Sequence, residues 1–189
     1  MEQQLVSSER TAGVRALAFD LDGTVYLGGT PLPGALELLA ALRSRQVPHL
    51  FVTNNSSTSS AAYLQKLSGL GLQPDPAQLL TSNDVARRHL LESGLNRPYL
   101  LATDEVRLDY ADAGLVHEED DPDAVLLTFD MTLDFRKLSL ATRHIAAGLP
   151  YLATHPDVTC PVPDGFLPDT GSFIELFKAA TGRRPEVLG

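Results

Sequence analysis

Two carboxylates stand at positions i and i+2 of one short segment, Asp20-Leu21-Asp22-Gly23-Thr24, directly after an apolar run. Side chains with this spacing share a face on extended backbone, so Asp20 and Asp22 are expected to act on the same group. One carboxylate can attack a phosphorus atom, while the other protonates the leaving oxygen and later deprotonates a water molecule. Gly23 permits a sharp turn that brings backbone N–H groups close to an anion. A structural turn, or a metal site without catalysis, is the alternative interpretation of the pair.

A second polar segment, Thr53-Asn54-Asn55-Ser56-Ser57, also follows an apolar run. If the two preceding strands are neighbours in a parallel sheet, the Thr53 hydroxyl and the Asn54 backbone N–H face the same phosphate as Asp20. A Thr/Asn-rich turn that satisfies its own backbone is the alternative. Because a phosphate dianion and two carboxylates repel one another, we expect a divalent cation between them. Mg²⁺ suits carboxylate and phosphate oxygens.

The elements that must position these segments alternate between strand and helix. Short apolar runs predict buried strands over residues 14–20, 49–53, 99–102, 124–129 and 151–154. Helices are expected over residues 35–46, 59–70, 82–92 (with Ser82 as the cap), 105–113 and 138–145, and from a capping box formed by Ser172 and Glu175. Residues 156–171 are expected to form a loop, and residues 186–188 the start of a strand. This alternation predicts a parallel α/β fold with right-handed crossovers.

Composition narrows the class of protein. The chain has 189 residues, of which 43% are hydrophobic and 21% charged, as in a folded globular protein. Its 15 basic and 24 acidic residues give a net charge of −9 with the basic residues scattered, which argues against a nucleic-acid partner. No apolar run is long enough for a membrane helix, and no signal peptide or cysteine pair is visible, so a cytoplasmic protein is expected. Cys160 has only His155 close in sequence as an activating base, which argues against a cysteine nucleophile.

The two polar segments and their surroundings resemble the haloacid dehalogenase superfamily of phosphatases. The similar branch includes NagD-like nucleotide phosphatases, p-nitrophenyl phosphatases and pyridoxal phosphate phosphatase. The first family motif matches Asp20 to Thr24, the second matches Thr53 to Asn55, and the similarity extends from about residue 14 to Gly189. By this resemblance Asp20 is the nucleophile and a Mg²⁺ ligand, and Asp22 is the acid/base and binds Mg²⁺ through its carbonyl. Thr53 and Asn54 hold the phosphate beside the turn at Gly23.

The resemblance also implies a Rossmann-like parallel-sheet core, incomplete in this chain, with an inserted α/β cap domain. The expected boundaries are a loose tail over 1–12, the first core segment over 13–81, the cap over 82–182 and the start of a return to the core over 183–189. The recognition loop of the family falls on residues 129–134, so Met131, Thr132 and Leu133 are candidates for leaving-group contacts. The partner is then a small phosphorylated metabolite, and a homodimer through the cap stays open.

Two loops depart from the family pattern. Where the family has Thr-Asn-Pro-Asp and a Pro-Gly-x-Gly turn, this chain has Thr154-His155-Pro156-Asp157 and Pro168-Asp169-Thr170-Gly171. These departures are expected to affect loop geometry and the preferred leaving group rather than the chemistry.

The third and fourth family motifs are not found before Gly189. The third is a lysine after the strand that follows the cap, and the fourth is a Gly-Asp pair that supplies another Mg²⁺ ligand; the lysines here are Lys66, Lys137 and Lys178. We therefore expect a Mg²⁺-dependent phosphatase of small metabolites, such as nucleoside monophosphates. The 189-residue chain itself should have little activity and leave apolar strand faces uncovered.

Other functions fit parts of the same pattern. A catalytically incomplete phosphate-binding or interaction module is one alternative, and a pyrophosphatase or phosphotransferase of the same superfamily is another. A receiver-type signalling domain is excluded, because its phosphorylated aspartate follows a later strand and it has no insertion of cap length.

Overall fold

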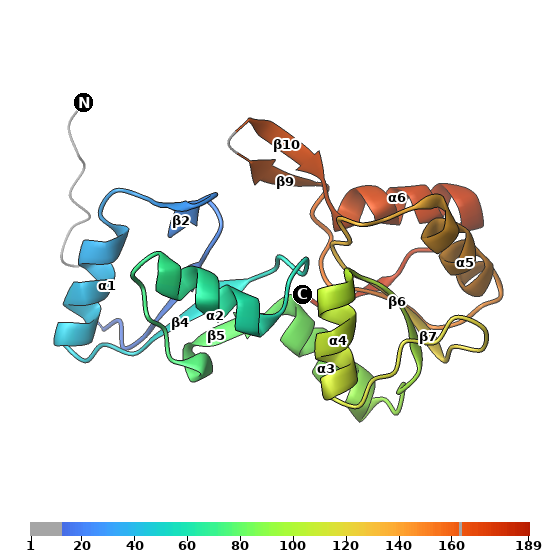
Figure 1. Cartoon of the computed structure of the whole chain (residues 1–189), viewed down its shortest axis with the longest axis horizontal. Coiled ribbons are helices and arrows are strands. Elements are labelled where there is room, and N and C mark those ends of the chain that lie inside the picture. Colours follow the sequence, from blue (N-terminus) through green and yellow to red (C-terminus); the bar gives the residue numbers. More distant parts are fainter. Residues whose placement is uncertain (1–12, 163) are drawn as a thin grey trace.

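The computed structural model describes residues 13–162 and 164–189, so the tail expected over residues 1–12 lies outside this part. The helices and strands form two α/β lobes that lie side by side (Figure 1). We call residues 13–81 the core lobe and residues 82–189 the cap lobe. Each lobe has its own parallel sheet, and among the described residues no strand belongs to both sheets. The predicted parallel α/β fold class is confirmed.

A three-stranded parallel sheet in the order β1-β4-β5 forms the centre of the core lobe. Its strands are β1 (Leu17–Asp20), β4 (His49–Thr53) and β5 (Leu79–Thr81), its helices are α1 (Ala35–Ser44) and α2 (Ser60–Gly69), and a 3-10 turn, η2 (Pro76–Gln78), precedes β5. A small antiparallel hairpin of β2 (Tyr26–Leu27) and β3 (Thr30–Pro31) follows β1. Asp20 is in register with Val52, so the two polar segments leave the same edge of the sheet.

The two faces of the core sheet differ in what covers them. Buried side chains of α1 and α2 pack around Phe51 on one face. Residues that alternate with Phe51 in the pleat point to the other face. There Ala18 and Leu80 are exposed, and Leu50 and Val52 are half-buried. The apolar face that the sequence predicts to be uncovered is therefore present, and Asp20 stands at its edge.

The cap lobe is a second parallel sheet, in the order β11-β8-β7-β6, with helices on both faces. The strands are β6 (Pro98–Leu101), β7 (Ala124–Leu127), β8 (Tyr151–Ala153) and β11 (Glu186–Val187), and the helices are α3 (Ser82–Glu92), α4 (Asp104–Asp112), α5 (Phe135–Ala146) and α6 (Thr170–Thr181). Leu100 and Leu126 pack with α3 and α4, whereas Tyr99 and Val125 pack with α5 and α6. Burial on both faces explains why β6, β7 and β8 are continuous apolar runs, whereas the edge strand β11 is exposed.

A two-stranded antiparallel hairpin, β9 (Thr159–Val162) and β10 (Gly165–Pro168), projects from the cap lobe (Figure 1). The sequence predicted only a loop over residues 156–171. That prediction was wrong because β10 is exposed throughout and β9 is at most half-buried, so neither strand carries the alternating apolar pattern of a packed sheet. The short strands β2, β3 and β5 were missed for a related reason, since each has only two or three residues.

Two N-cap residues differ from the sequence-based expectations. Thr81, not Ser82, caps α3, and Asp169, not Ser172, caps α6. In both places several neighbouring polar residues could serve as the cap, so the sequence alone does not choose among them. The longest helices, α5 and α6, have 12 residues each. Within the described ranges, no helix combines the length and the apolar character that crossing a membrane requires.

The end of the chain joins the cap lobe. Glu186 and Val187, expected to begin a return to the core, instead pair in parallel with β8 of the cap sheet. Gly189 then lies close to Ser82 and Thr154, where the two lobes meet (Figure 1). The chain therefore returns to the junction after adding an edge strand to the cap sheet.

Packing on the central strands should dominate the stability of the cap. Leu126 of β7 is fully buried, whereas Leu108 of α4 is 68% exposed. We expect Leu126→Ala to lower the free energy of unfolding by about 2–5 kcal/mol and Leu108→Ala by less than about 0.5 kcal/mol. Urea unfolding followed by circular dichroism measures both changes. Similar effects of the two substitutions would contradict the described core.

Candidate active site

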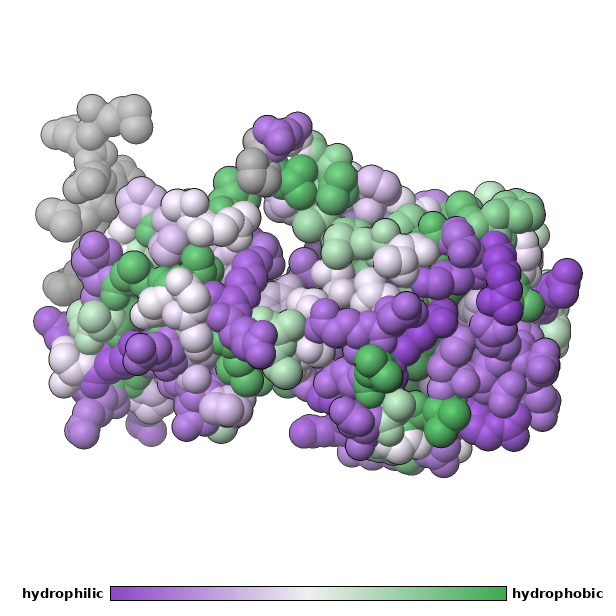
Figure 2. All heavy atoms as spheres, in the orientation of Figure 1, coloured by the Kyte–Doolittle hydropathy of each residue, from purple (hydrophilic) through white to green (hydrophobic). Residues whose placement is uncertain are grey.

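A cleft of about 490 Å³ lies where the carboxyl ends of β1 and β4 face the β9–β10 hairpin. Its lining residues are Asp20, Asp22, Val52, Asn54 and Asn55 from the core lobe and Asp157, Thr159, Cys160, Pro161 and Asp169 from the cap lobe. Figure 2 shows the hollow between the two lobes beneath the hairpin. Side chains from both lobes thus face one space.

The turn after β1 holds the two predicted carboxylates. Gly23 has a φ of +84°, a left-handed conformation that glycine adopts without strain, and its N–H donates to the Tyr26 carbonyl over 2.7 Å. Thr24 Oγ1 donates a hydrogen bond of 3.1 Å to Asp20 Oδ2. Asp20 and Asp22 both line the cleft. The sharp turn therefore presents both carboxylates to the same space.

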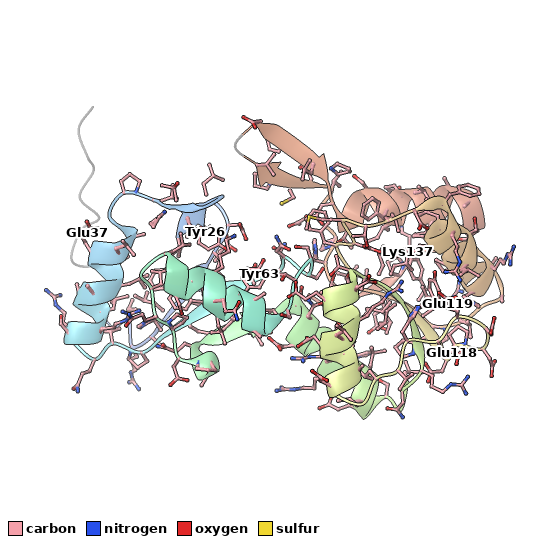
Figure 3. All side chains as sticks on the ribbon, in the orientation of Figure 1. Tyr26, Glu37, Tyr63, Glu118, Glu119 and Lys137 are labelled. Carbon is pink, nitrogen blue, oxygen red and sulfur yellow. The ribbon has the colours of Figure 1, made fainter. Side chains whose placement is uncertain are left out.

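Asp22 has two partners that the sequence did not indicate. The Tyr26 hydroxyl donates to Asp22 Oδ2 over 3.1 Å, and Lys66 Nζ of α2 lies 3.7 Å from Asp22 Oδ1 and 4.0 Å from the centre of the Tyr26 ring. Burial, followed by the nearby Asp22 charge, raises the pKa of Tyr26, so the hydroxyl remains a donor at neutral pH. Figure 3 shows Tyr26 and Tyr63 in the core lobe. Lys66 was missed because its contact with Asp22 forms only when α2 packs beside the turn.

The second polar segment enters the cleft through Asn54 rather than through the Thr53 side chain. Asn54 lines the cleft, and its side-chain amide donates to the Asp157 carboxylate of the cap lobe. Thr53 is only 2% exposed, and its Oγ1 accepts a hydrogen bond of 3.2 Å from the Asn55 N–H. The pleat turns Thr53 to the face opposite Val52, and Thr53 does not line the cleft, so its contact with the phosphate stays a prediction.

Several cleft residues come from the hairpin and were not proposed from the sequence as site residues. Thr159, Cys160 and Pro161 of β9 lie across the cleft from the carboxylate pair, with Asp157 just before them. The one available signal was the departure of residues 154–157 and 168–171 from the family pattern. Those departures flank the hairpin on both sides. Because they were expected to affect the preferred leaving group, they could have indicated that the segment between them contributes to the site.

His155 and Asp169 form a buried pair at the base of the hairpin. His155 Nε2 lies 3.0 Å from Thr170 Oγ1 and 3.5 Å from Asp169 Oδ1, and the two residues are 1% and 5% exposed. Burial lowers the pKa of His155 and raises the pKa of Asp169, because it disfavours a separate charge on each group. Asp169 also lines the cleft, while His155 supports it from behind.

The candidate recognition residues lie outside this cleft. Met131 and Leu133 line a separate, mostly apolar groove of about 390 Å³, together with Leu167 and Pro168 of β10. Thr132 Oγ1 donates to Asp130 Oδ1 over 2.6 Å and accepts from Lys137 Nζ over 2.7 Å; Figure 3 shows Lys137 in the cap lobe. Pro168 lines the groove, and the next residue, Asp169, lines the cleft.

The charge of the cleft fits a divalent cation. Four aspartates line it, and none of the described lining residues is a lysine or an arginine, so a phosphate dianion alone would be repelled. Within the described residues, no group of three His, Cys, Asp or Glu side chains could hold a metal ion by itself. Mg²⁺ usually binds one or two carboxylates and fills its shell with water and phosphate oxygens. The oxygens of Asp20 and Asp22 match that requirement.

The core sheet, the carboxylate pair at its edge and the cap that faces it define a two-lobed α/β fold with a ligand cleft between the lobes. The family model for haloacid dehalogenase-like hydrolases matches residues 17–116, which include both polar segments. The chain therefore belongs to the haloacid dehalogenase-like hydrolases.

Individual relatives fall in the branch that the motifs indicated. The acid sugar phosphatase of Staphylococcus haemolyticus is 32% identical over 172 residues, which cover 90% of this chain and 65% of that protein. The structure of 4-nitrophenylphosphatase from Thermotoga maritima has a TM-score of 0.88 at 36% identity, covering 93% of this chain and 68% of the other. The structure of a glycerol phosphate phosphatase from Mycobacterium tuberculosis, in complex with magnesium, has a TM-score of 0.82 at 35% identity. The match covers 93% of this chain and 54% of the other. The chain spans 65% to 68% of the length of the curated relatives it matches.

Cys160, the single cysteine of the chain, should report on the cleft. Burial raises the pKa of its thiol, so less thiolate is present at pH 8 than in an exposed cysteine. We expect iodoacetamide to alkylate the folded chain more slowly than the same chain in concentrated urea, and Mg²⁺ with orthovanadate to slow it further. Mass spectrometry over time measures the rates. Equal rates in the folded and unfolded chains would contradict the position of Cys160.

Proposed function

We propose that this chain carries the nucleophile, the phosphate-binding segment and the cap of a Mg²⁺-dependent phosphatase that hydrolyses phosphomonoesters of small metabolites. The observation that carries the proposal is one cleft with Asp20, Asp22 and Asn54 on one side and the cap hairpin on the other. The names of two relatives, an acid sugar phosphatase and a glycerol phosphate phosphatase, favour a sugar or polyol phosphate over a nucleoside monophosphate.

In the proposed reaction, an Asp20 carboxylate oxygen bonds to phosphorus as the ester P–O bond breaks. Asp22 gives its proton to the departing alkoxide and later takes one from the water that attacks the aspartyl-phosphate, releasing phosphate and regenerating Asp20. Asn54 supplies a donor to the phosphoryl oxygens. The turn at Gly23, whose own N–H is bonded to the Tyr26 carbonyl, places Asp20 and Asp22 beside them, and buried Thr53 holds the following backbone. Mg²⁺, held by the Asp20 carboxylate and the Asp22 carbonyl, would offset the charge between carboxylates and phosphate.

The leaving group would lie against the hairpin, because Thr159, Cys160 and Pro161 face the carboxylates across the cleft. A space of about 490 Å³ suits a small metabolite. Met131, Thr132 and Leu133 remain candidates for contact with esters long enough to reach the separate groove that Met131 and Leu133 line. A homodimer through the cap also remains a prediction.

In the form of the protein that turns over p-nitrophenyl phosphate fastest with Mg²⁺, Asp20→Asn should lower that turnover by several orders of magnitude, because it removes the nucleophile. Asp22→Asn should impair alkyl phosphates more than p-nitrophenyl phosphate, since a phenolate leaves readily without a proton. Asp104→Asn, an exposed change on α4 that does not line the cleft, is the matched control. Near-normal turnover by Asp20→Asn would exclude the covalent mechanism.

The same assay compares the 189-residue chain with any form that its coding sequence continues past Gly189. Greater turnover in the continued form supports the expectation that the first core segment needs further motifs for charge compensation. Phosphate binding without turnover in every form would instead favour a phosphate-binding module.

Two single substitutions separate the cleft from the groove as the leaving-group site. Cys160→Leu adds bulk in the cleft, so it should change the ratio of kcat/KM between a sugar phosphate and p-nitrophenyl phosphate by about fivefold or more. Met131→Leu, in the groove, should leave that ratio within about twofold. The reverse ranking would move the leaving group to residues 131–133.

A further inference from the structure

The segment Asn54–Ser59 follows a strand of the core lobe but is hydrogen-bonded mainly to the cap lobe. Side chains of the cap donate to its backbone carbonyls: Ser82 Oγ to Asn54 (2.7 Å), Asn83 Nδ2 to Ser56 (3.3 Å) and Thr58 (3.1 Å), and Thr103 Oγ1 to Ser57 (3.1 Å). Ser56 is fully buried, and its Oγ accepts from the Phe129 N–H and lies 2.8 Å from Thr154 Oγ1. The position of this segment therefore depends on the cap.

Glu105 of α4 makes the densest of these contacts. Its Oε1 accepts hydrogen bonds from Thr58 Oγ1 (2.8 Å), the Ser59 N–H (2.9 Å) and Ser59 Oγ (2.6 Å). Ser59 caps α2, and Glu105 lies in the first turn of α4, so one carboxylate stands at the N-termini of two helices. The hydrogen bonds from Ser59 lower the pKa of Glu105, which keeps it ionised at neutral pH.

A short series of hydrogen bonds connects this anchor with the cleft. The Ser57 N–H and Oγ donate to Asn55 Oδ1 over 3.0 and 2.8 Å, and the Asn55 N–H donates to Thr53 Oγ1 over 3.2 Å. Asn54, which lines the cleft, lies between the two ends of this series. A displacement at Ser59 would therefore move the backbone that carries Asn54.

We infer that Glu105 is a positioning residue for phosphate binding: from the cap, it fixes the turn at Thr58 and Ser59 and thereby holds Asn54 opposite Asp20. The inference rests on the proposed function, because it takes Asn54 to be a phosphate contact. Through Glu105, helix α4 would contribute to the affinity for the phosphoryl group although it lies outside the cleft.

Three variants test the inference. Glu105→Ala removes the acceptor, Glu105→Gln keeps an oxygen that can accept the same bonds, and Asp104→Ala changes the neighbouring acidic residue of the same turn. With Mg²⁺ present, calorimetric titration should show the Kd for inorganic phosphate rising about tenfold in Glu105→Ala, staying within about threefold in Glu105→Gln and not changing in Asp104→Ala.

Amide hydrogen exchange supplies a readout that needs no activity. Glu105→Ala should speed exchange at Ser57 and Ser59 while the central cap strands keep their protection. Unchanged exchange there, or unchanged phosphate affinity despite faster exchange, would overturn the inference. If no form of the protein, neither the 189-residue chain nor one that its coding sequence continues past Gly189, binds phosphate or hydrolyses an ester, the proposed function itself is wrong and the inference falls with it.

Discussion

The parallel pairing of β1 with β4 is the constraint on which the candidate site depends. Asp20 is opposite Val52 in this register, so the turn at Gly23 and the segment that begins at Asn54 leave the sheet side by side. A slip of one residue would send every side chain of one strand to the other face. Asp20 would then point toward the buried cluster around Phe51 rather than into the cleft.

The charge of the cleft and the attachment of the cap to the core lobe are structurally linked. Four aspartates meet in a space with no basic lining residue among those described, and Lys66 is a cation close to one of them. A divalent ion is therefore part of the proposed function. Side chains of the cap hold the backbone of the segment that carries Asn54. Because the cap both lines the cleft and supports that backbone, its placement would affect the phosphate as well as the leaving group in the proposed reaction.

The sequence predicted the parts of this molecule that local pattern controls. Composition identifies buried strands such as residues 124–127, and spacing identifies the carboxylate pair of Asp20 and Asp22. The orientation of Thr53 was not predictable in the same way, because a pleat assigns its face only once the register is known. Lys66 lies beside Asp22, and Glu105 bonds Thr58 and Ser59, only after distant segments of the chain have packed together, so the sequence alone does not predict these contacts. The hairpin was missed because its strands pack against little and carry no apolar alternation.

The segregation of the two sheets along the chain has a consequence during synthesis. The described strands of the core sheet lie within residues 17–81 and those of the cap sheet within residues 98–187, with no interleaving. Each sheet can therefore form from a contiguous stretch of nascent chain, and the entropy of loop closure is small for each. The core strands leave the ribosome first, with one apolar face still open to water. The cap sheet does not cover that face, so the face stays open to chaperones throughout translation of the cap.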